Sequence, residues 1–236
     1  MKLGLFIINK IIIILKNNNI NIEYNFINSD SSILIFNDFD GDIVINDKGN
    51  IVDSNVKINY IELNNNKINQ LSTLNVDKNS QLTINTIYLG VNEKTITFDL
   101  INAKPDSIVE INNNIVCLDS AKFSLECVGK IEKGAKRSVC HQKSHCLTID
   151  NPKLAKVLPV LLIDENDVEA SHSLSSGTID EEILFYMNSR GLDKKHALNL
   201  ILKSYLMPND DYYDEFENGK QIQERAIQKV DRICSM

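Results

Sequence analysis

His172 is the strongest candidate in the chain for a residue with a chemical role. It follows an acidic turn, Asp164 to Asp167, and lies in a serine-rich bend. A neutral imidazole is a good metal ligand and exchanges its proton near neutral pH. Asp167 and Glu169 are near enough in sequence to supply a carboxylate that would fix its tautomer. An isolated histidine in a bend is more often structural, so the residue types alone leave both interpretations open.

A second candidate for chemistry is the segment from Cys140 to Cys146, which reads CHQKSHC. Its cysteines and histidines are typical metal ligands, although Cys-x5-Cys is not a standard zinc spacing. In an extended strand, Cys140 and Cys146 face one side while His141 and His145 face the other. One ion could therefore bind all four only if the segment contained a turn. The residue types predict metal binding by Cys140 and Cys146, and local surface composition is the alternative.

The elements around His172 change type along the chain. The apolar run from Leu158 to Ile163 is too short for a helix and predicts a buried strand. Thr178 and Glu181 have the three-residue spacing of a capping box. We therefore expect a helix from Ile179 to about Arg190, so that His172 lies where a sheet passes into helices.

Short strands and short turns are expected from Ile20 to Ile163. Apolar and polar residues alternate there with period 2, and no helical period persists over ten residues. A sandwich, a barrel and a β-solenoid are all compatible with this pattern, and no strict repeat selects among them.

Beyond Gly177 the apolar period becomes 3.6, which predicts three helices and an acidic linker over residues 209–218. The expected inward positions are Ile179, Ile183, Leu184, Met187, Ala197, Leu198, Ile201, Leu202, Tyr205, Ile222, Ala226, Ile227, Val230 and Ile233. Such stripes are usually intramolecular core, but at the end of a chain they are equally compatible with a partner's groove.

Composition limits the possible partners. The 236-residue chain has a net charge of −7, which argues against nucleic-acid binding. Its five cysteines are an odd number without a secretory cleavage site, which favours reduced thiols. The apolar segment from Leu3 to Leu15 is shorter than the ~20 residues of a spanning helix. We expect no membrane role and a packed N-terminal segment.

Several positions at fixed spacing resemble a known family. They are Asp167-Val168, Ser171-His172, Gly177, Asp180-Glu181-Glu182, Leu184-Phe185-Tyr186 and Ser189-Arg190-Gly191. Together they resemble the C-terminal signature of the SufB/SufD family of SUF iron–sulfur cluster assembly proteins. The likeness extends more weakly upstream through Gly129-Lys130-Ile131 and Lys133-Gly134-Ala135 to Gln142, and covers residues 128 to 206. Ser173 stands where the SufB branch usually has an acidic residue, which favours the SufD branch.

This resemblance implies a fold. The family's core is a right-handed parallel β-helix, in which each coil buries its apolar face by stacking on its neighbours. We therefore expect a mainly β chain with a C-terminal α part: an apolar N-terminal segment at 1–19, a β-helix core at 20–176 and a helical domain at 177–236. The family generally lacks the cysteines and histidines of the 140–146 segment, which weakens a metal site there. The chain is shorter than typical members, on the N-terminal side.

The resemblance also implies a function. The chain would be a non-catalytic scaffold subunit, paired through its last coils with a SufB-like subunit and through its helices with the SufC ATPase. His172 would lie at the SufB interface, where a nascent iron–sulfur cluster is shared. Reduced flavin would be bound by the assembled complex. The complex would be located in the cytoplasm or in a plastid stroma. Candidate partner-binding residues on the helices are Leu184, Phe185, Tyr186, Arg190 and Ile201.

Two alternatives remain at this stage. An exported β-helix enzyme acting on polysaccharide would have the same strand pattern, and a purely structural partner of SufB would have the same signature. No Walker-type phosphate loop is present, so any ATP hydrolysis belongs to another chain.

Overall fold

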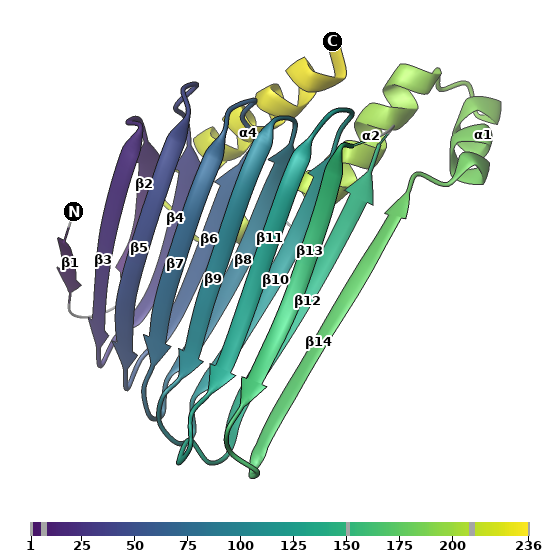
Figure 1. The fold of residues 1–236 in the computed structure, drawn as a ribbon. Coiled ribbons are helices and arrows are strands. Elements are labelled where there is room, and N and C mark those ends of the chain that lie inside the picture. Colours follow the sequence, from purple (N-terminus) through teal and green to yellow (C-terminus); the bar gives the residue numbers. More distant parts are fainter. Residues whose placement is uncertain (1, 6–8, 150–151, 208–210, 236) are drawn as a thin grey trace.

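The computed structural model describes residues 2–5, 9–149, 152–207 and 211–235, and its main body is a parallel β-solenoid (Figure 1). Within these residues, strands alternate between two seven-stranded sheets that face each other across a lumen. Sheet A contains β1 (Lys2–Leu5), β3 (Asn19–Ile27), β5 (Ile43–Val52), β7 (Ile68–Val76), β9 (Glu93–Asn102), β11 (Lys122–Ile131) and β13 (Leu154–Ile163). Sheet B contains β2 (Asn9–Leu15), β4 (Asp30–Asn37), β6 (Asn55–Glu62), β8 (Gln81–Gly90), β10 (Ile108–Cys117), β12 (Ser138–Thr148) and β14 (Val168–Thr178). The predicted β-helix is confirmed.

Period-2 alternation produces this architecture because successive side chains of a strand point to opposite faces. In β11, Phe123, Leu125 and Cys127 are buried in the lumen, and the residues between them face outward. Each internal strand pairs in parallel with the strand one coil before and one coil after it, as β11 does with β9 and β13. A single coil cannot cover its own apolar face, so stacking supplies most of the core.

A turn repeated at the same corner of five coils sets the stacking. Each copy has a residue with positive φ followed by a buried serine: Asn28-Ser29, Asp53-Ser54, Asn79-Ser80, Asp106-Ser107 and Arg137-Ser138. Four of the five positive-φ residues are Asn or Asp, which tolerate the left-handed region best after glycine. The serines form a ladder, in which Ser29 N–H donates to Ser54 Oγ at 3.0 Å and the Ser107 and Ser138 hydroxyls lie 2.9 Å apart.

The solenoid begins earlier than the sequence predicts. β2 pairs with β4 over Asn9 to Leu15, and β1 pairs with β3, so the segment expected as a separate N-terminal unit belongs to the sheets. Leu15 is buried in the lumen. Its isoleucine-rich sequence lacks alternation because β2 has apolar neighbours on both faces, the lumen on one and the helices on the other.

The helices that follow β14 are α1 (Glu181–Ser189), α2 (Lys194–Leu206), α3 (Asp211–Asp214) and α4 (Gly219–Ser235). Of these, α2, α3 and α4 lie against the outer face of sheet B, whereas α1 lies beyond the end of β14 (Figure 1). Ile222, Ala226 and Val230 of α4 are buried in one cluster with Phe36 of β4. Arg225 and Lys229 of the same helix lie 3.2 and 3.5 Å from the carboxylate of Asp38. The stripe on α4 is therefore intramolecular core; the side chain of Ile233 lies outside the described part.

Three local predictions around the helices are wrong. His172 lies within β14 and not in a bend, because the serine-rich segment pairs with β12 along its whole length. The N-cap of α1 is Asp180, whose carboxylate accepts from Glu182 N–H at 2.8 Å; Thr178 still belongs to β14. The expected acidic linker contains α3, and its Tyr213 and Phe216 are buried against sheet B. Residues 208–210 lie outside the described part.

Candidate functional site

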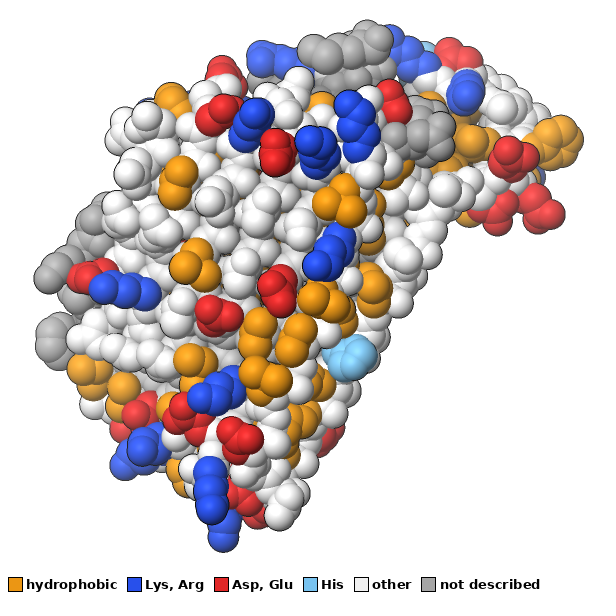
Figure 2. All heavy atoms as spheres, in the orientation of Figure 1, with side chains coloured by type: hydrophobic (Ala, Val, Ile, Leu, Met, Phe, Trp, Pro, Cys, Tyr) orange, Lys and Arg blue, Asp and Glu red, His pale blue; other side chains and the backbone are white. Residues whose placement is uncertain are grey.

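The last coil, formed by β13 and β14, is here called the open end, because no further strand of the described residues stacks on it. Ile163 on β13 and Leu174 on β14 occupy lumen positions that are buried in an internal coil, but here they are exposed. Leu158 and Leu162 of β13 are also exposed, on the outer face of sheet A. Figure 2 shows the outer face of sheet A, on which hydrophobic side chains gather in the part nearest the open end. Exposed apolar surface next to two unpaired strand edges is typical of an interaction surface.

His172 lies on β14 at the open end. Its register partner on β12 is Gln142, whose side chain is buried in the lumen. Because register partners in a parallel sheet point to the same face, His172 faces the lumen side. It is nevertheless exposed, because β14 is the last strand of sheet B. The imidazole is therefore presented at the mouth of the lumen, where a molecule covering the open end would meet it.

The structure does not bring Asp167 and Glu169 to His172. Glu169 is three residues away on the same strand, and so points to the opposite face of sheet B. Its carboxylate lies 3.4 Å from Nε2 of His141, and Nδ1 of that histidine lies 2.8 Å from Ser171 Oγ. Asp167 precedes the strand, and its backbone carbonyl accepts from Arg137 N–H. A tautomer-fixing role for these two carboxylates has no geometric support.

The sequence gives little indication that Gln142 is important, because the residue only marks the end of the weaker upstream part of the family likeness. Its Nε2 donates to the backbone carbonyl of Val160 at 3.1 Å, so the side chain bridges the two sheets just beneath the open end. Gly129 makes room for it: a Cβ at that position would lie 2.8 Å from Gln142 Nε2 and 2.5 Å from Cys140 Sγ. Only a glycine leaves the lumen wide enough here for both side chains.

The cysteines of the 140–146 segment are buried in the lumen as alternation predicts, and the two histidines face outward. Burial raises the pKa of Cys140 to about 11, so its thiol is protonated at neutral pH. Six residues of strand separate Cys140 from Cys146, roughly 20 Å, which is too far to share an ion. Among the described residues, no three His, Cys, Asp or Glu side chains gather at metal-binding distance. Metal binding by this segment stays a prediction.

Cys117 and Cys127 also lie inside the lumen. A hydrogen bond between the thiols of Cys117 and Cys146 raises the pKa of the first and lowers that of the second. Burial raises the pKa of Cys127 to about 12. These groups behave as small core residues with weak polar contacts.

The helices expose some of the residues predicted to bind partners. Phe185 and Tyr186 of α1 are 75% and 57% exposed, and the Arg190 guanidinium lies 5.3 Å from the Tyr186 ring centroid. Leu184 and Ile201 are half-buried. None of the residues of α1, all of which are described, is buried. This helix is therefore an apolar surface without an intramolecular cover.

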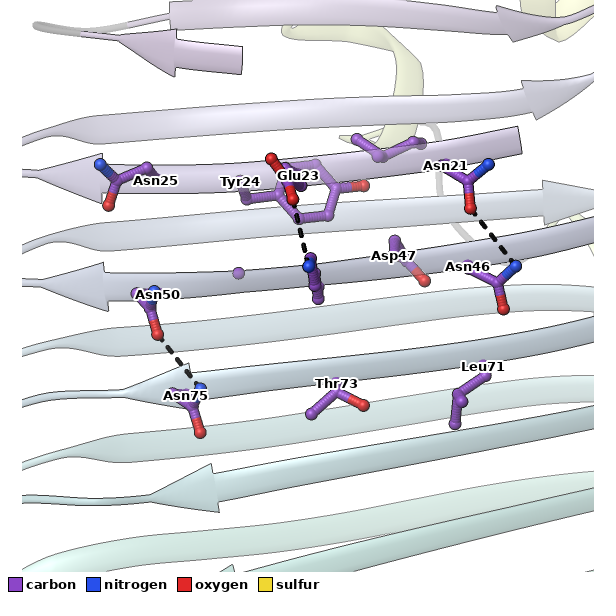
Figure 3. A pocket seen from close by; sticks show the side chains of 13 residues that line it. Asn21, Glu23, Tyr24, Asn25, Asn46, Asp47, Asn50, Leu71, Thr73 and Asn75 are labelled. Atoms are coloured by element: carbon purple, nitrogen blue, oxygen red, sulfur yellow. Dashed lines mark hydrogen bonds and ion pairs between the residues drawn. The ribbon is translucent and has the colours of Figure 1, made fainter. Parts of the chain in front are cut away.

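A hollow of about 1050 Å³ lies on the outer face of sheet A, over β3, β5 and β7 (Figure 3). Paired asparagines line it, including Asn21 with Asn46, and its Glu23 carboxylate is paired with Lys48 at 3.1 Å. The carboxylate of Asp47 is taken by Ser72 and Tyr60 within the lumen. Glycoside hydrolysis needs two carboxyl groups facing the same sugar, so this hollow gives no support to a polysaccharide-acting enzyme.

Taken together, the strands and the open end define a parallel β-helix protein with a histidine at the mouth of its lumen. Residues 13–205 match the profile described as "SUF system FeS cluster assembly, SufBD core domain". This match covers most of the chain, and the chain belongs to the SufB/SufD family. Membership supports a role in SUF iron–sulfur cluster assembly.

Relatives agree with this assignment. Over 125 residues the chain is 35% identical to the iron–sulfur cluster assembly protein SufD of Bacillus subtilis, covering 52% of this chain and 29% of the relative. Over 80 residues it is 35% identical to a SufBD family protein of Pyrococcus horikoshii, covering 34% and 18%. A SufBD family protein of Mycobacterium tuberculosis is 25% identical over 109 residues, covering 46% and 13%. The chain thus spans less than a third of the length of these relatives.

None of the helices in the described residues is long and apolar enough to cross a membrane.

Proposed function

We propose that this chain is a SufD-like scaffold subunit whose open end pairs with a SufB-like subunit, and that His172 takes part in building an iron–sulfur cluster at that junction. The observation that carries the proposal is the position of His172. It is exposed on the lumen side of the last strand, beside the apolar side chains of the open end. A partner that stacks on this coil would bury those side chains and enclose the histidine.

The chemistry of the open end suits pairing with another β-helix. The free edges of β13 and β14 present backbone N–H and C=O groups that an added strand can satisfy. A neutral imidazole enclosed in the junction can bind iron or carry a proton. The growing cluster is the cargo of this site, shared with the partner.

The helices support a second contact, with a SufC-like ATPase. Phe185 and Tyr186 of α1 expose an aromatic surface, and Arg190 lies over one of its rings. Aromatic and arginine side chains dominate the binding energy of protein interfaces. Leu184 and Ile201, on neighbouring helices, would complete this surface.

Flavin is assigned to the complex and not to this chain. The hollow of Figure 3 is lined mainly by asparagine and ion-paired side chains, whereas an isoalloxazine ring needs flat apolar walls. We place the assembled complex where the SUF machinery operates, in the cytoplasm or a plastid stroma.

Anaerobic reconstitution with SufB-like and SufC-like proteins tests the proposal. Complex formation is scored by gel filtration, and cluster formation by iron and sulfide content. His172→Ala should assemble the complex but lose most of the bound iron and sulfide. His145→Ala is the matched control, because this histidine faces outward from the neighbouring strand.

A purely structural role for the chain predicts another result. If the His172→Ala complex accumulates iron and sulfide at the wild-type rate, the histidine is dispensable and the chain only holds its partner in place. Failure of the wild-type chain to bind a SufB-like protein would refute the pairing itself.

A further inference from the structure

The lumen contains an acceptor without a donor, next to His172. Within the described part of the chain, Gln142 Oε1 is fully buried and has no hydrogen-bond partner. The amide cannot be turned round to remove the problem, because its Nε2 donates to the Val160 carbonyl, and only the N–H₂ group can do so. A bare buried acceptor has lost its hydrogen bond to water and gained none in return, so its persistence calls for an explanation.

His172 lies next to Gln142 on the lumen side of the adjacent strand and can supply the missing donor. It is the register partner of Gln142 on the adjacent strand, and side chains at paired positions of one face lie about 5 Å apart. Because the imidazole is exposed, it can rotate about its side-chain bonds and turn an N–H towards Gln142. A neutral imidazole has one N–H to donate, and the nitrogen that donates fixes which nitrogen remains a free acceptor.

We propose that Gln142 is the positioning residue of His172: its Oε1 accepts the imidazole N–H and leaves the other ring nitrogen free to face the open end. This role was predicted for Asp167 and Glu169, which the fold turns away. Gly129 contributes indirectly, because the absence of a Cβ there leaves the space in which the Gln142 amide lies. The inference rests on the proposed function for its consequence in cluster assembly, but the bond itself can be measured without a partner.

The first experiment records the nitrogen chemical shifts of ¹⁵N-histidine in the full chain, with His172 assigned from His172→Asn. In the wild type, His172 should be a single tautomer. In Gln142→Met, which has the same reach and no acceptor oxygen, the shifts should move towards those of a mixture of both tautomers.

Ser144→Ala is the matched control. Ser144 is two residues along the same strand, buried on the same face and bonded to Asn113 Nδ2 at 3.0 Å, but its register partner is Leu174. This variant loses a buried hydrogen bond and should leave the His172 shifts unchanged. If Gln142→Met fails to fold, as judged by its circular dichroism spectrum, Gly129→Ala takes its place, because its Cβ displaces the amide from the opposite wall.

The second experiment is the reconstitution with SufB-like and SufC-like proteins. The rate of cluster formation should fall about tenfold in Gln142→Met, the lower end of the range for residues that orient a metal ligand. Identical His172 shifts in the wild type and a folded Gln142→Met would overturn the inference, whatever the cluster assay gives. If the shifts change but His172→Ala assembles clusters normally, the bond is real and the proposed function fails instead.

Discussion

Asp47→Asn should abolish a stability loss that the wild-type chain undergoes as pH rises. Asp47 lies in the lumen of β5 and is 2% exposed. Its carboxylate accepts from the hydroxyl of Ser72 at 2.5 Å and from that of Tyr60. Burial raises the pKa of this carboxyl from 3.8 to about 6, although the bonds from both hydroxyls act in the opposite direction. The folded chain therefore holds the proton more tightly than the unfolded chain.

The sign and size follow from linkage. Between about pH 4 and pH 6 the folded state binds more protons at this site than the unfolded state, so stability falls as pH rises and is constant above the folded pKa. A shift of about two pKa units corresponds to about 3 kcal/mol. Asparagine is neutral at every pH and keeps one acceptor oxygen. The variant should therefore gain roughly 2–3 kcal/mol over the wild type between pH 4 and pH 7.

Urea unfolding followed by circular dichroism, at a series of pH values from about 4 to 7, measures this difference. Other titrating groups are common to both proteins, so the difference between the two free energies of unfolding isolates Asp47. Ser72→Ala provides a matched variant: it removes a bond that lowers the pKa of Asp47, so its stability should fall by more than that of the wild type and continue to fall up to a higher pH. Parallel pH profiles for Asp47→Asn and the wild type would refute the reasoning.

Three further predictions concern the core and the helices. Lys94 is fully buried with its Nζ 3.0 Å from Glu62, so Lys94→Met should cost about 3–5 kcal/mol of unfolding free energy in urea, and adding Glu62→Gln should recover part of it; a loss below 1 kcal/mol would contradict this. Ala226→Asp places a carboxylate in the contact between α4 and sheet B, so limited proteolysis should release the helices while the strand signal in circular dichroism persists; equal protease resistance would contradict it. Phe185→Ser removes a side chain that is 75% exposed, so stability should change by less than about 0.5 kcal/mol while affinity for a SufC-like ATPase falls at least tenfold in a titration; unchanged affinity would contradict the proposed surface.

Local chemistry made parts of the fold predictable. Alternation identified the strands between residues 20 and 163. Asp193 has a side chain typical of an N-cap, and its carboxylate accepts from His196 N–H at 2.8 Å at the start of α2. The coil repeat escaped detection because its length changes: hydrogen-bonded partners on neighbouring coils are 25 residues apart at Asn21 and Asn46 but 31 apart at Asn113 and Ser144. The repeat is visible in the sequence only as the Asn-Ser and Asp-Ser pairs. These mark the corner of each coil where a residue in the left-handed region precedes a buried serine hydroxyl.

The serine-rich strand β14 was missed for a different reason. Its serines have low strand preference, and the strand exists because it pairs with β12 in register from Ser138 to Thr148. His172 therefore faces the lumen side and Glu169 faces away, an arrangement that only the assignment of this segment as a strand can give.

The sequence by itself determined which residues share a face and that the chain belongs near the SufB/SufD family. Side-chain period depends only on local backbone geometry, and a spaced signature survives without knowledge of the fold. The tertiary structure decided that α4 covers sheet B, that the coil of β13 and β14 stays uncovered, and that Gln142 lies beside His172. These depend on strand register and stacking order, because period 2 is the same in every β architecture and carries no information about which strand lies next to which.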